Sequence, residues 1–152
     1  MARRSAGLLM FRHSAGGLQV LLVHPGGPAW TSADLGAWSI PKGEYDESED
    51  ALAAAVREFK EETGWTATAP FLPLGSIRQH GGKLVSAWAF EGDADPATLV
   101  SNTFEIVDMV NGAVGRFPEV DRAAWFEPAE ARRRVMTSQA AFIDELERVV
   151  QR

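Results

Sequence analysis

The segment from Asp46 to Thr63 constrains the fold of this chain more than any other. It contains neither glycine nor proline, and alanine is frequent in it. Its apolar side chains recur at the spacing of one helical face, namely Leu52, Ala55, Val56 and Phe59. Because this spacing brings side chains to one side of a helix, we expect an amphipathic helix that packs against the rest of a folded domain.

Both ends of this helix are marked by capping residues. Asp46, with Glu49 three positions later, forms a capping-box pattern, and Ser48 is the alternative N-cap. Gly64 stands where a residue in the left-handed conformation would end the helix. The expected helix therefore covers residues 46–63.

Three carboxylates lie on a neighbouring face of the same helix. At about 100° per residue, Glu58, Glu61 and Glu62 fall within an arc of about 100°, which excludes Arg57 and Lys60. Like charges at this spacing repel each other, and a solvated acidic surface is the ordinary interpretation of such a run. A site for a hard divalent cation is the alternative. The chain has no cysteine, which leaves oxygen and imidazole ligands, and Mg²⁺ and Mn²⁺ prefer oxygen ligands such as these carboxylates.

The rest of the chain alternates short apolar runs with turn residues, which predicts a sheet. The expected strands are residues 8–11, 18–23, 38–40, 71–77, 84–90, 103–107 and 123–126. The run 84–90 is apolar on both alternations and is expected in the centre of the sheet. Residues 41–44 and the glycine-bearing run up to Pro118 are expected as loops. The histidines are also expected in loops, at His13, His24 and His80.

Two further helices are expected near the C-terminus. Pro128 suits the first turn of a helix that continues to Val135, and Thr137 or Ser138 can cap a last helix. Strands interleaved with helices in this order predict an α/β sandwich, with helices packed on a mixed sheet.

A longer pattern joins the carboxylates to Gly43. From Gly43 the sequence runs five residues to Glu49, seven more residues, and then Arg57-Glu58-Phe59-Lys60-Glu61-Glu62-Thr63-Gly64-Trp65. It resembles the Nudix box, G-x5-E-x7-R-E-U-x-E-E-x-G-U with U a bulky apolar residue, at every defined position. The seven fixed letters would match by accident at about one in 10⁸ starting points.

The flanking sequence resembles the same family. Ser5-Ala6-Gly7 precedes an expected strand, Trp38-Ser39-Ile40-Pro41-Lys42 leads into Gly43, and Trp125-Phe126 comes late in the chain. The resemblance is therefore to a single Nudix hydrolase domain over residues 1–152, with the box at 43–65. It implies an α/β fold, the Nudix-type α/β/α sandwich in which a mixed β-sheet is packed between helices.

The resemblance to this MutT-like family also implies an activity. Its members are metal-dependent pyrophosphohydrolases that cleave a nucleoside diphosphate linked to another moiety by attack of water on phosphorus. Mg²⁺ is the implied cofactor, with Mn²⁺ as a substitute. The net charge of −6 agrees with this, because an acidic chain needs bound cations to neutralise an anionic pyrophosphate. A catalytically silent Nudix-fold module that binds nucleotides or regulates is the alternative, although such modules tend to lose the box glutamates that are intact here.

The resemblance assigns roles to residues of the box. The positions that correspond to metal ligands are Gly43, through its carbonyl, Glu58, Glu61 and Glu62. Glu58 or Glu61 is the expected catalytic carboxylate that deprotonates or orients the water. Glu49 and Arg57 correspond to an orienting pair.

Six residues outside these box positions are further candidates. Glu119 resembles the acidic residue that many members bring from a late loop to the metal site, and an exposed loop glutamate is the other interpretation. Trp30, in an irregular loop, can stack on a base. Lys42, Arg78, Lys83 and Arg116 are cations near expected loops that can meet phosphates.

The substrate branch is less sharply defined by the sequence. The Pro-Lys-Gly entry to the box and the Ser-Ala-Gly start are similar to those of enzymes that act on dinucleoside polyphosphates of the Ap4A type. Gly81 stands where the nucleotide-sugar branch often has a proline, and the tyrosine that is frequent there in the dinucleoside polyphosphate branch is also absent. Dinucleoside polyphosphates and nucleoside triphosphates are the expected substrates.

Charge and hydropathy restrict the partners. With 15 Lys and Arg against 21 Asp and Glu, the net charge is negative, which disfavours binding along the anionic backbone of a nucleic acid. A 5′-phosphorylated end is the one nucleic-acid substrate that we retain. Arg12 and His13 end the first apolar run long before the roughly 18 residues that a membrane span needs. We expect a cytoplasmic monomer or homodimer that acts on a small nucleotide.

Overall fold

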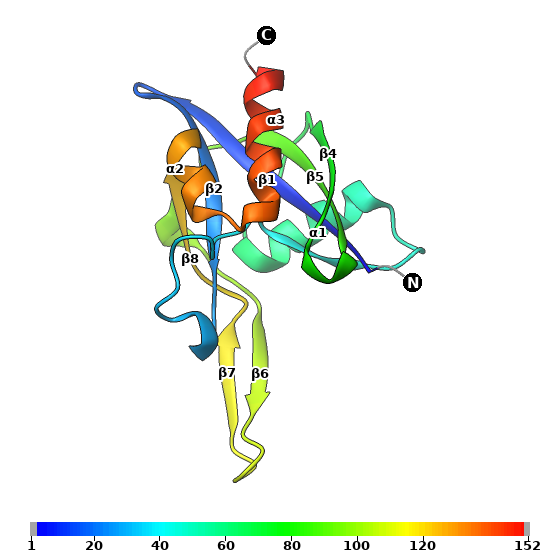
Figure 1. Ribbon diagram of the computed structural model, residues 1–152, viewed down its shortest axis with the longest axis vertical. Coiled ribbons are helices and arrows are strands. Elements are labelled where there is room, and N and C mark those ends of the chain that lie inside the picture. Colours follow the sequence, from blue (N-terminus) through cyan, green and yellow to red (C-terminus); the bar gives the residue numbers. More distant parts are fainter. Residues whose placement is uncertain (1–2, 151–152) are drawn as a thin grey trace.

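The computed structural model describes residues 3–150, so Met1, Ala2 and positions 151–152 of the predicted domain lie outside the described residues. A six-stranded sheet forms the centre of the molecule (Figure 1). Its strand order is β4 (Leu72–Arg78), β5 (Leu84–Glu91), β1 (Arg4–Ser14), β2 (Gly17–Pro25) and β8 (Val120–Phe126), and β3 (Lys42–Tyr45) also pairs with β1. Only β1 and β5 run parallel, so the sheet is mixed, and the expected interior position of residues 84–90 is confirmed.

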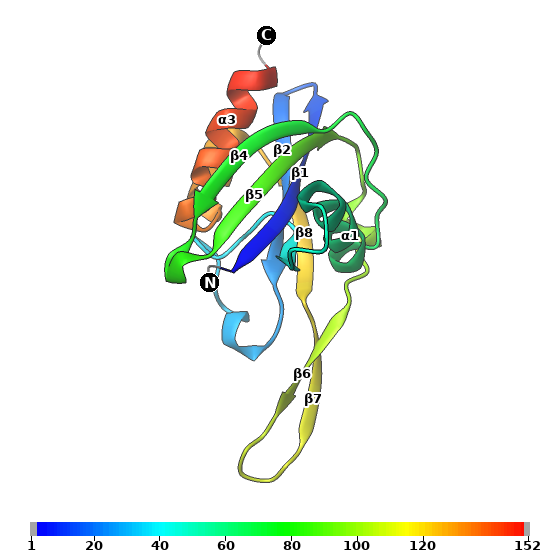
Figure 2. The ribbon, with the colours of Figure 1, turned by 90° about the vertical axis from the view of Figure 1, so that its right-hand side faces the viewer.

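Helices cover both faces of this sheet (Figure 2). The helix α1 (Ala51–Thr63) packs on β1, β3 and β5, whereas α2 (Pro128–Arg134) and α3 (Ala140–Val150) pack on the opposite face. Successive residues of β1 alternate between the two cores, with Leu8 packed on the α1 side and Leu9 on the α2 and α3 side. The predicted α/β sandwich is confirmed. None of the helices within residues 3–150 has the length and apolar character needed to cross a membrane.

The start of α1 differs from the prediction. Asp50, rather than Asp46 or Ser48, is the N-cap, and its carboxylate accepts the backbone N–H of Ala53 at 3.1 Å. Asp46 instead accepts the N–H of Ser48 at 2.9 Å in a turn after β3. The capping-box pattern was misleading because both aspartates can close such a turn. Gly64 ends the helix with a φ of 80°, as predicted.

Residues 41–44 are not the expected loop, because most of them belong to β3. This strand pairs antiparallel with residues 4–7 of β1. Gly7 permits the close approach, since a Cβ there would lie 2.6 Å from the carbonyl oxygen of Pro41. The expected strand at residues 38–40 is reduced to two isolated bridges, Val23 to Ser39 and Trp38 to Val135.

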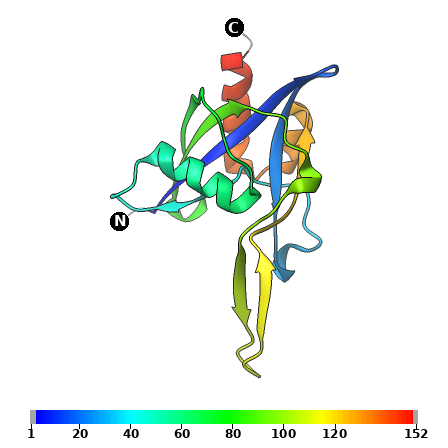
Figure 3. The same ribbon diagram turned by 180° about the vertical axis from the view of Figure 1, so that it is seen from behind.

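A two-stranded hairpin projects from the body of the molecule (Figures 1 and 3). It consists of β6 (Thr103–Val107) and β7 (Val114–Pro118), so the run up to Pro118 is a strand and not the expected loop. The Glu105–Arg116 ion pair at 2.8 Å and the facing rings of Phe104 and Phe117 stabilise the pairing across the two strands.

The remaining elements are short. They are the 3-10 turns Pro28–Trp30, His80–Gly82, Pro96–Thr98 and Thr137–Gln139. The last of these precedes α3, so Thr137 and Ser138 lie in this turn and not at the cap of α3. The histidine prediction is wrong at two positions, because His13 lies in β1 and His24 is fully buried at the end of β2.

Candidate active site

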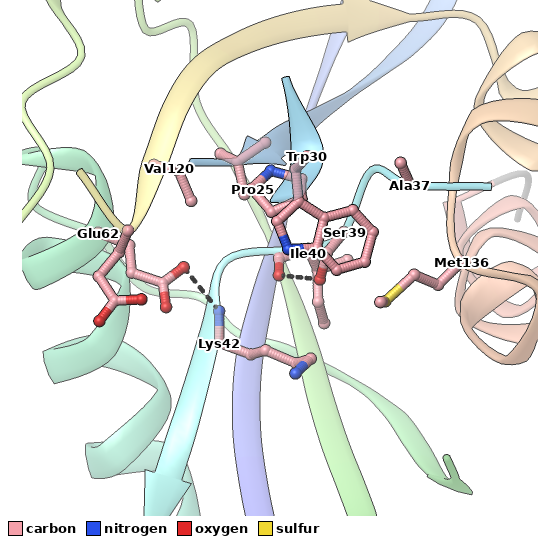
Figure 4. Close-up of a pocket in the computed structure, with 11 residues that line it drawn as sticks. Pro25, Trp30, Ala37, Ser39, Ile40, Lys42, Glu62, Val120 and Met136 are labelled. Atoms are coloured by element: carbon pink, nitrogen blue, oxygen red, sulfur yellow. Dashed lines mark hydrogen bonds between the residues drawn. The ribbon is translucent and has the colours of Figure 1, made fainter. Parts of the chain in front are cut away.

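The carboxylate face of α1 lies against β3. The backbone N–H of Lys42 donates to Oε1 of Glu62 at 3.3 Å, as Figure 4 shows. One residue later, Gly43 lies against Glu58, and a Cβ at position 43 would come within 2.0 Å of Cδ of Glu58. A side chain of any size at position 43 would therefore displace Glu58, which explains why glycine opens the box.

Glu119 reaches the same region from the junction of β7 and β8. Its N–H donates to the carbonyl oxygen of Asn102 at 2.8 Å, and its own carbonyl oxygen accepts the N–H of Gly26 at 2.9 Å. The N–H of Asn102 in turn donates to the carbonyl oxygen of Glu61 at 2.8 Å. These backbone bonds fix the late glutamate relative to the end of α1.

Two cavities adjoin at this place. The carboxylate cavity, of about 390 Å³, is lined by Ser5, Lys42, Gly43, Glu44, Glu58, Glu62, Lys83, Asn102 and Glu119. The aromatic cavity, of about 150 Å³, is lined by Trp30, Lys42, Glu62 and Glu119 together with Val23, Pro25, Ala37, Ser39, Ile40, Val120 and Met136. In Figure 4, Glu62 lies at one end of the aromatic cavity and Met136 at the other, with Trp30 between them. The two cavities share Lys42, Glu62 and Glu119, so a ligand can occupy both at once.

The carboxylates of this site are held in an unfavourable electrostatic environment. Burial, reinforced by the charges of Glu58 and Glu119, raises the pKa of Glu62 to about 8 against the stabilising influence of Lys42. Burial is also the main cause that raises the pKa of Glu58. The pKa of Lys42 is lowered by burial and by the nearby charge of Lys83. Added positive charge in the carboxylate cavity would therefore stabilise its ionised carboxylates.

Arg57 organises the outer side of the carboxylate cluster. Its guanidinium binds Glu49 through two hydrogen bonds, of 2.8 Å from Nε and 2.9 Å from Nη2. Nη1 donates to Glu58 at 2.7 Å and to Glu61 at 3.0 Å. These bonds raise the pKa of Arg57 and lower the pKa of Glu49. The predicted Glu49–Arg57 pair is present, and it also orients two carboxylates of the box.

The donor set fits a hard divalent cation. The cavity offers oxygen ligands from Glu58, Glu62 and Glu119 beside the backbone of Gly43, and no cysteine competes for softer metals. Within residues 3–150 no three acidic, cysteine or histidine side chains are already gathered as a closed ligand cluster. Glu61 is 42% exposed and held by Arg57, so it does not line the cavity. A bound cation that uses Glu61 as a ligand would have to draw it away from Arg57, whereas Glu58 already lines the cavity.

The predicted cations divide into two groups. Lys42 lines both cavities and Lys83 lines the carboxylate cavity, but Arg78 and Arg116 line neither. Arg78 borders a separate cavity and donates to the carbonyl oxygen of Gly82 at 3.3 Å, while Arg116 pairs with Glu105 on the projecting hairpin. The structure therefore leaves the last two outside the site that it forms around the carboxylates.

Three residues that line the carboxylate cavity were not among the predicted site residues. Glu44, Asn102 and Ser5 all border this cavity. Strand pairing explains two of them, because Ser5 lies opposite both Glu44 of β3 and Val85 of β5. Lys83, one of the predicted cations, precedes β5 by one residue, and the parallel pairing of β5 with β1 brings it to this cavity. Asn102 depends on the path of the chain before β6, for which the sequence gives no local sign.

Comparisons with known proteins agree with the box. A family model described as NUDIX domain matches residues 1–146. A Caenorhabditis elegans protein named bis(5′-nucleosyl)-tetraphosphatase (asymmetrical) is 38% identical over 66 residues, which are 43% of this chain and 44% of that protein. The chain thus aligns with less than half the length of this relative.

Solved structures share the fold. The binary complex of a C. elegans Ap4A hydrolase has a TM-score of 0.66 at 21% identity and covers 97% of this chain and 98% of its own. The NUDIX domain of Shewanella oneidensis NrtR, complexed with ADP ribose, has a TM-score of 0.69 at 15% identity and covers 99% of this chain and 89% of its own. Identities this low show the fold alone. The family model spans all but the last six residues, and with this match the predicted resemblance is confirmed: the chain belongs to the NUDIX domain family.

Proposed function

We propose that this protein is a Nudix hydrolase, a metal-dependent pyrophosphohydrolase that cleaves a nucleoside diphosphate linked to another moiety. The observation that carries the proposal is the carboxylate cavity, in which Glu58, Glu62 and Glu119 meet Lys42 and Lys83. An anionic pyrophosphate needs positive charge around it, and hydrolysis needs an oriented water. This cavity provides two lysines and a group of carboxylates that suits a cation.

Mg²⁺, or Mn²⁺ in its place, would be held by Glu58, Glu61, Glu62 and Glu119 with the carbonyl of Gly43, and it would neutralise phosphate oxygens and acidify water. The chain's own residues do the rest. Lys42 and Lys83 line the cavity and would face the phosphates, and Arg57 orients Glu58. Glu58, whose pKa is raised by burial, is the carboxylate we assign to accept the proton from the attacking water, with Glu61 as the alternative.

We assign the nucleoside to the aromatic cavity. Trp30 is 36% exposed and presents its ring to the cavity, next to the apolar side chains of Ile40 and Met136. A base stacked on an aromatic ring contributes about 1–3 kcal/mol. Since Lys42, Glu62 and Glu119 belong to both cavities, a base on Trp30 would place its phosphates at the carboxylates.

Dinucleoside polyphosphates and nucleoside triphosphates are the substrates we favour. The C. elegans relative is named as a bis(5′-nucleosyl)-tetraphosphatase, and the NUDIX domain of NrtR was solved with ADP ribose. The substrate in the first name and the ligand in the second both combine a nucleoside with a chain of phosphates. Adjoining aromatic and cationic cavities suit that combination.

A substrate panel tests this proposal. Diadenosine tetraphosphate, ADP-ribose, nucleoside triphosphates and 5′-triphosphorylated RNA are incubated with the protein and Mg²⁺ or Mn²⁺ in ¹⁸O-labelled water, and the products are weighed by mass spectrometry. We expect turnover of a dinucleoside polyphosphate or a nucleoside triphosphate, with one ¹⁸O in the product at the attacked phosphorus. Nucleotide binding without turnover of any compound would support the silent binding module instead.

A further inference from the structure

His24 is fully buried, yet it lines neither the carboxylate cavity nor the aromatic cavity. It lies where β2 ends, immediately before the Pro25-Gly26-Gly27 turn that leads to Trp30. A polar ring in such a place is stable only when its nitrogens are hydrogen-bonded. Both nitrogens have partners, and the two partners lie on different segments of the site.

One nitrogen leads to Trp30. Nε2 of His24 donates to the carbonyl oxygen of Ala33 at 2.6 Å. The N–H of Ala33 donates to the carbonyl oxygen of Trp30 at 3.0 Å. Two hydrogen bonds in series therefore connect the imidazole to the backbone that carries the exposed indole.

The other nitrogen leads to Glu119. Nδ1 of His24 lies 2.9 Å from Oδ1 of Asp121, which is the second residue after Glu119. The N–H of Gly26, two residues after His24, donates to the carbonyl oxygen of Glu119 at 2.9 Å. One side-chain hydrogen bond and one backbone hydrogen bond thus join the end of β2 to the start of β8.

The imidazole itself is held in place by aromatic packing. The ring of Trp38 meets it edge-on with centroids 5.2 Å apart, and Nε1 of Trp38 donates to Oδ1 of Asp34 at 2.9 Å. Asp34 also accepts a hydrogen bond of 2.8 Å from Arg134. Ala33 and Asp34 are therefore fixed side by side, one through His24 and the other through Trp38 and Arg134.

We propose that His24 is a positioning residue that sets the distance and orientation of Trp30 relative to Glu119. It touches neither substrate nor cation. Its bond to Ala33 keeps the indole of Trp30 in position, and its bond to Asp121 keeps the segment that carries Glu119 in place. This inference rests on the proposed function, since it assigns the nucleoside to Trp30 and a cation ligand to Glu119.

Two amide variants separate the two bonds. In His24→Asn the shorter amide takes the place of Nδ1 and keeps the Asp121 contact, whereas in His24→Gln the longer amide reaches the place of Nε2 and keeps the Ala33 contact. With diadenosine tetraphosphate at saturating Mg²⁺, we expect His24→Asn to raise KM about 3- to 10-fold and to change kcat less than about 2-fold. We expect His24→Gln to keep KM and to raise the half-saturating Mg²⁺ concentration about 3- to 10-fold.

The same variant made in Trp30→Ala protein shows whether the effect of His24→Asn on KM depends on the indole of Trp30. In Trp30→Ala protein, His24→Asn is expected to leave KM unchanged, because the group that it positions is gone. An undiminished rise in KM there, or equal effects of the two amide variants on KM and on Mg²⁺ saturation, would overturn the inference. Asp121→Ala, which removes the partner of Nδ1 and leaves the imidazole in place, is expected to match His24→Gln and serves if the histidine variants do not fold.

Hydrogen exchange tests the same inference without any turnover. We expect the amide of Ala33 to exchange at least about 5-fold faster in His24→Asn than in the natural sequence, and to stay slow in His24→Gln. Unchanged exchange at Ala33 would overturn the positioning role. If the natural protein hydrolyses nothing while these exchange rates differ as expected, the proposed function fails and the structural link from His24 to Trp30 stands.

Discussion

A Cβ placed on Gly43 would lie 2.0 Å from Cδ of Glu58, so a side chain at position 43 would take the place of the Glu58 carboxylate. Such a separation is far inside van der Waals contact, and the obstructing atoms belong to a carboxylate that Arg57 also holds, at 2.7 Å. The glycine that opens the box is therefore a packing requirement of the cavity.

Gly43→Ala should abolish most activity. The added methyl group pushes Glu58 out of the carboxylate cavity, and we expect kcat to fall by about 100-fold or more. Steady-state kinetics at saturating Mg²⁺ measures this. Gly16→Ala is the matched control, because the nearest atom to a Cβ there is Oγ of Ser14 at 4.0 Å. Activity of Gly43→Ala within about 3-fold of the natural protein would contradict the packing argument.

Arg57→Lys should lower kcat more than it raises KM. A lysine keeps the charge but cannot bind Glu49 through two bonds and still reach Glu58 and Glu61. With Glu58 less well oriented, we expect kcat to fall about 10- to 100-fold and KM to change less than about 3-fold. Arg148→Lys, on the exposed side of α3, serves as control. Loss of substrate affinity with unchanged kcat would argue that Arg57 acts on binding instead.

The raised pKa of Glu62 predicts how stability varies with pH when no metal is present. The folded state holds this proton to about pH 8, whereas the unfolded chain releases it near the ordinary value of 4.5. The stabilisation that this group contributes is therefore complete below pH 4.5 and is lost as the pH rises from 4.5 to about 8. Glu62→Gln cannot ionise, so it should escape this loss.

Chemical denaturation in EDTA measures this difference. At pH 8.5 we expect Glu62→Gln to unfold with a free energy about 1–3 kcal/mol larger than that of the natural protein, and at pH 4.5 we expect the two to be nearly equal. Glu105→Gln, an exposed position on the hairpin, should show no such pH-dependent gain. Parallel pH profiles for Glu62→Gln and the natural protein would contradict the burial of this carboxylate.

Trp30→Ala should weaken nucleotide binding. Among residues 3–150, the indole is the one large flat surface that lines the aromatic cavity, and its stacking energy of about 1–3 kcal/mol corresponds to a rise in KM of about 5- to 150-fold. Trp30→Phe should recover part of the affinity. Comparing a substrate that has no base, such as inorganic triphosphate, isolates the effect, since its KM should not depend on Trp30. An unchanged KM for the nucleotide in Trp30→Ala would place the base elsewhere.

The sequence was most informative where the chemistry is local. Glu58, Glu62 and the Glu49–Arg57 pair lie on one helix and the turn before it, so helical spacing alone brings them together. The box pattern then connected this helix to Gly43. The same reasoning placed Gly64 correctly at the end of α1.

The sequence was least informative where partners come from distant strands. Lys83 enters the site because β5 pairs in parallel with β1, and neither strand carries a mark of that register. Arg78, only five residues earlier, resembles it in sequence and borders a different cavity. His24 has no ligand-like neighbour in the sequence, because both of its hydrogen-bond partners depend on how the Trp30 segment and β8 fold back on β2.

Metal-dependent turnover by the natural protein and by Glu62→Gln tests the central claim most directly. Diadenosine tetraphosphate is hydrolysed over a Mg²⁺ titration that starts in EDTA, with Glu105→Gln as the charge-matched control. We predict no turnover without metal, saturable turnover with it, a fall in kcat of about 100-fold or more in Glu62→Gln, and no change in Glu105→Gln. Turnover that survives EDTA, or that folded Glu62→Gln retains in full, would contradict the account.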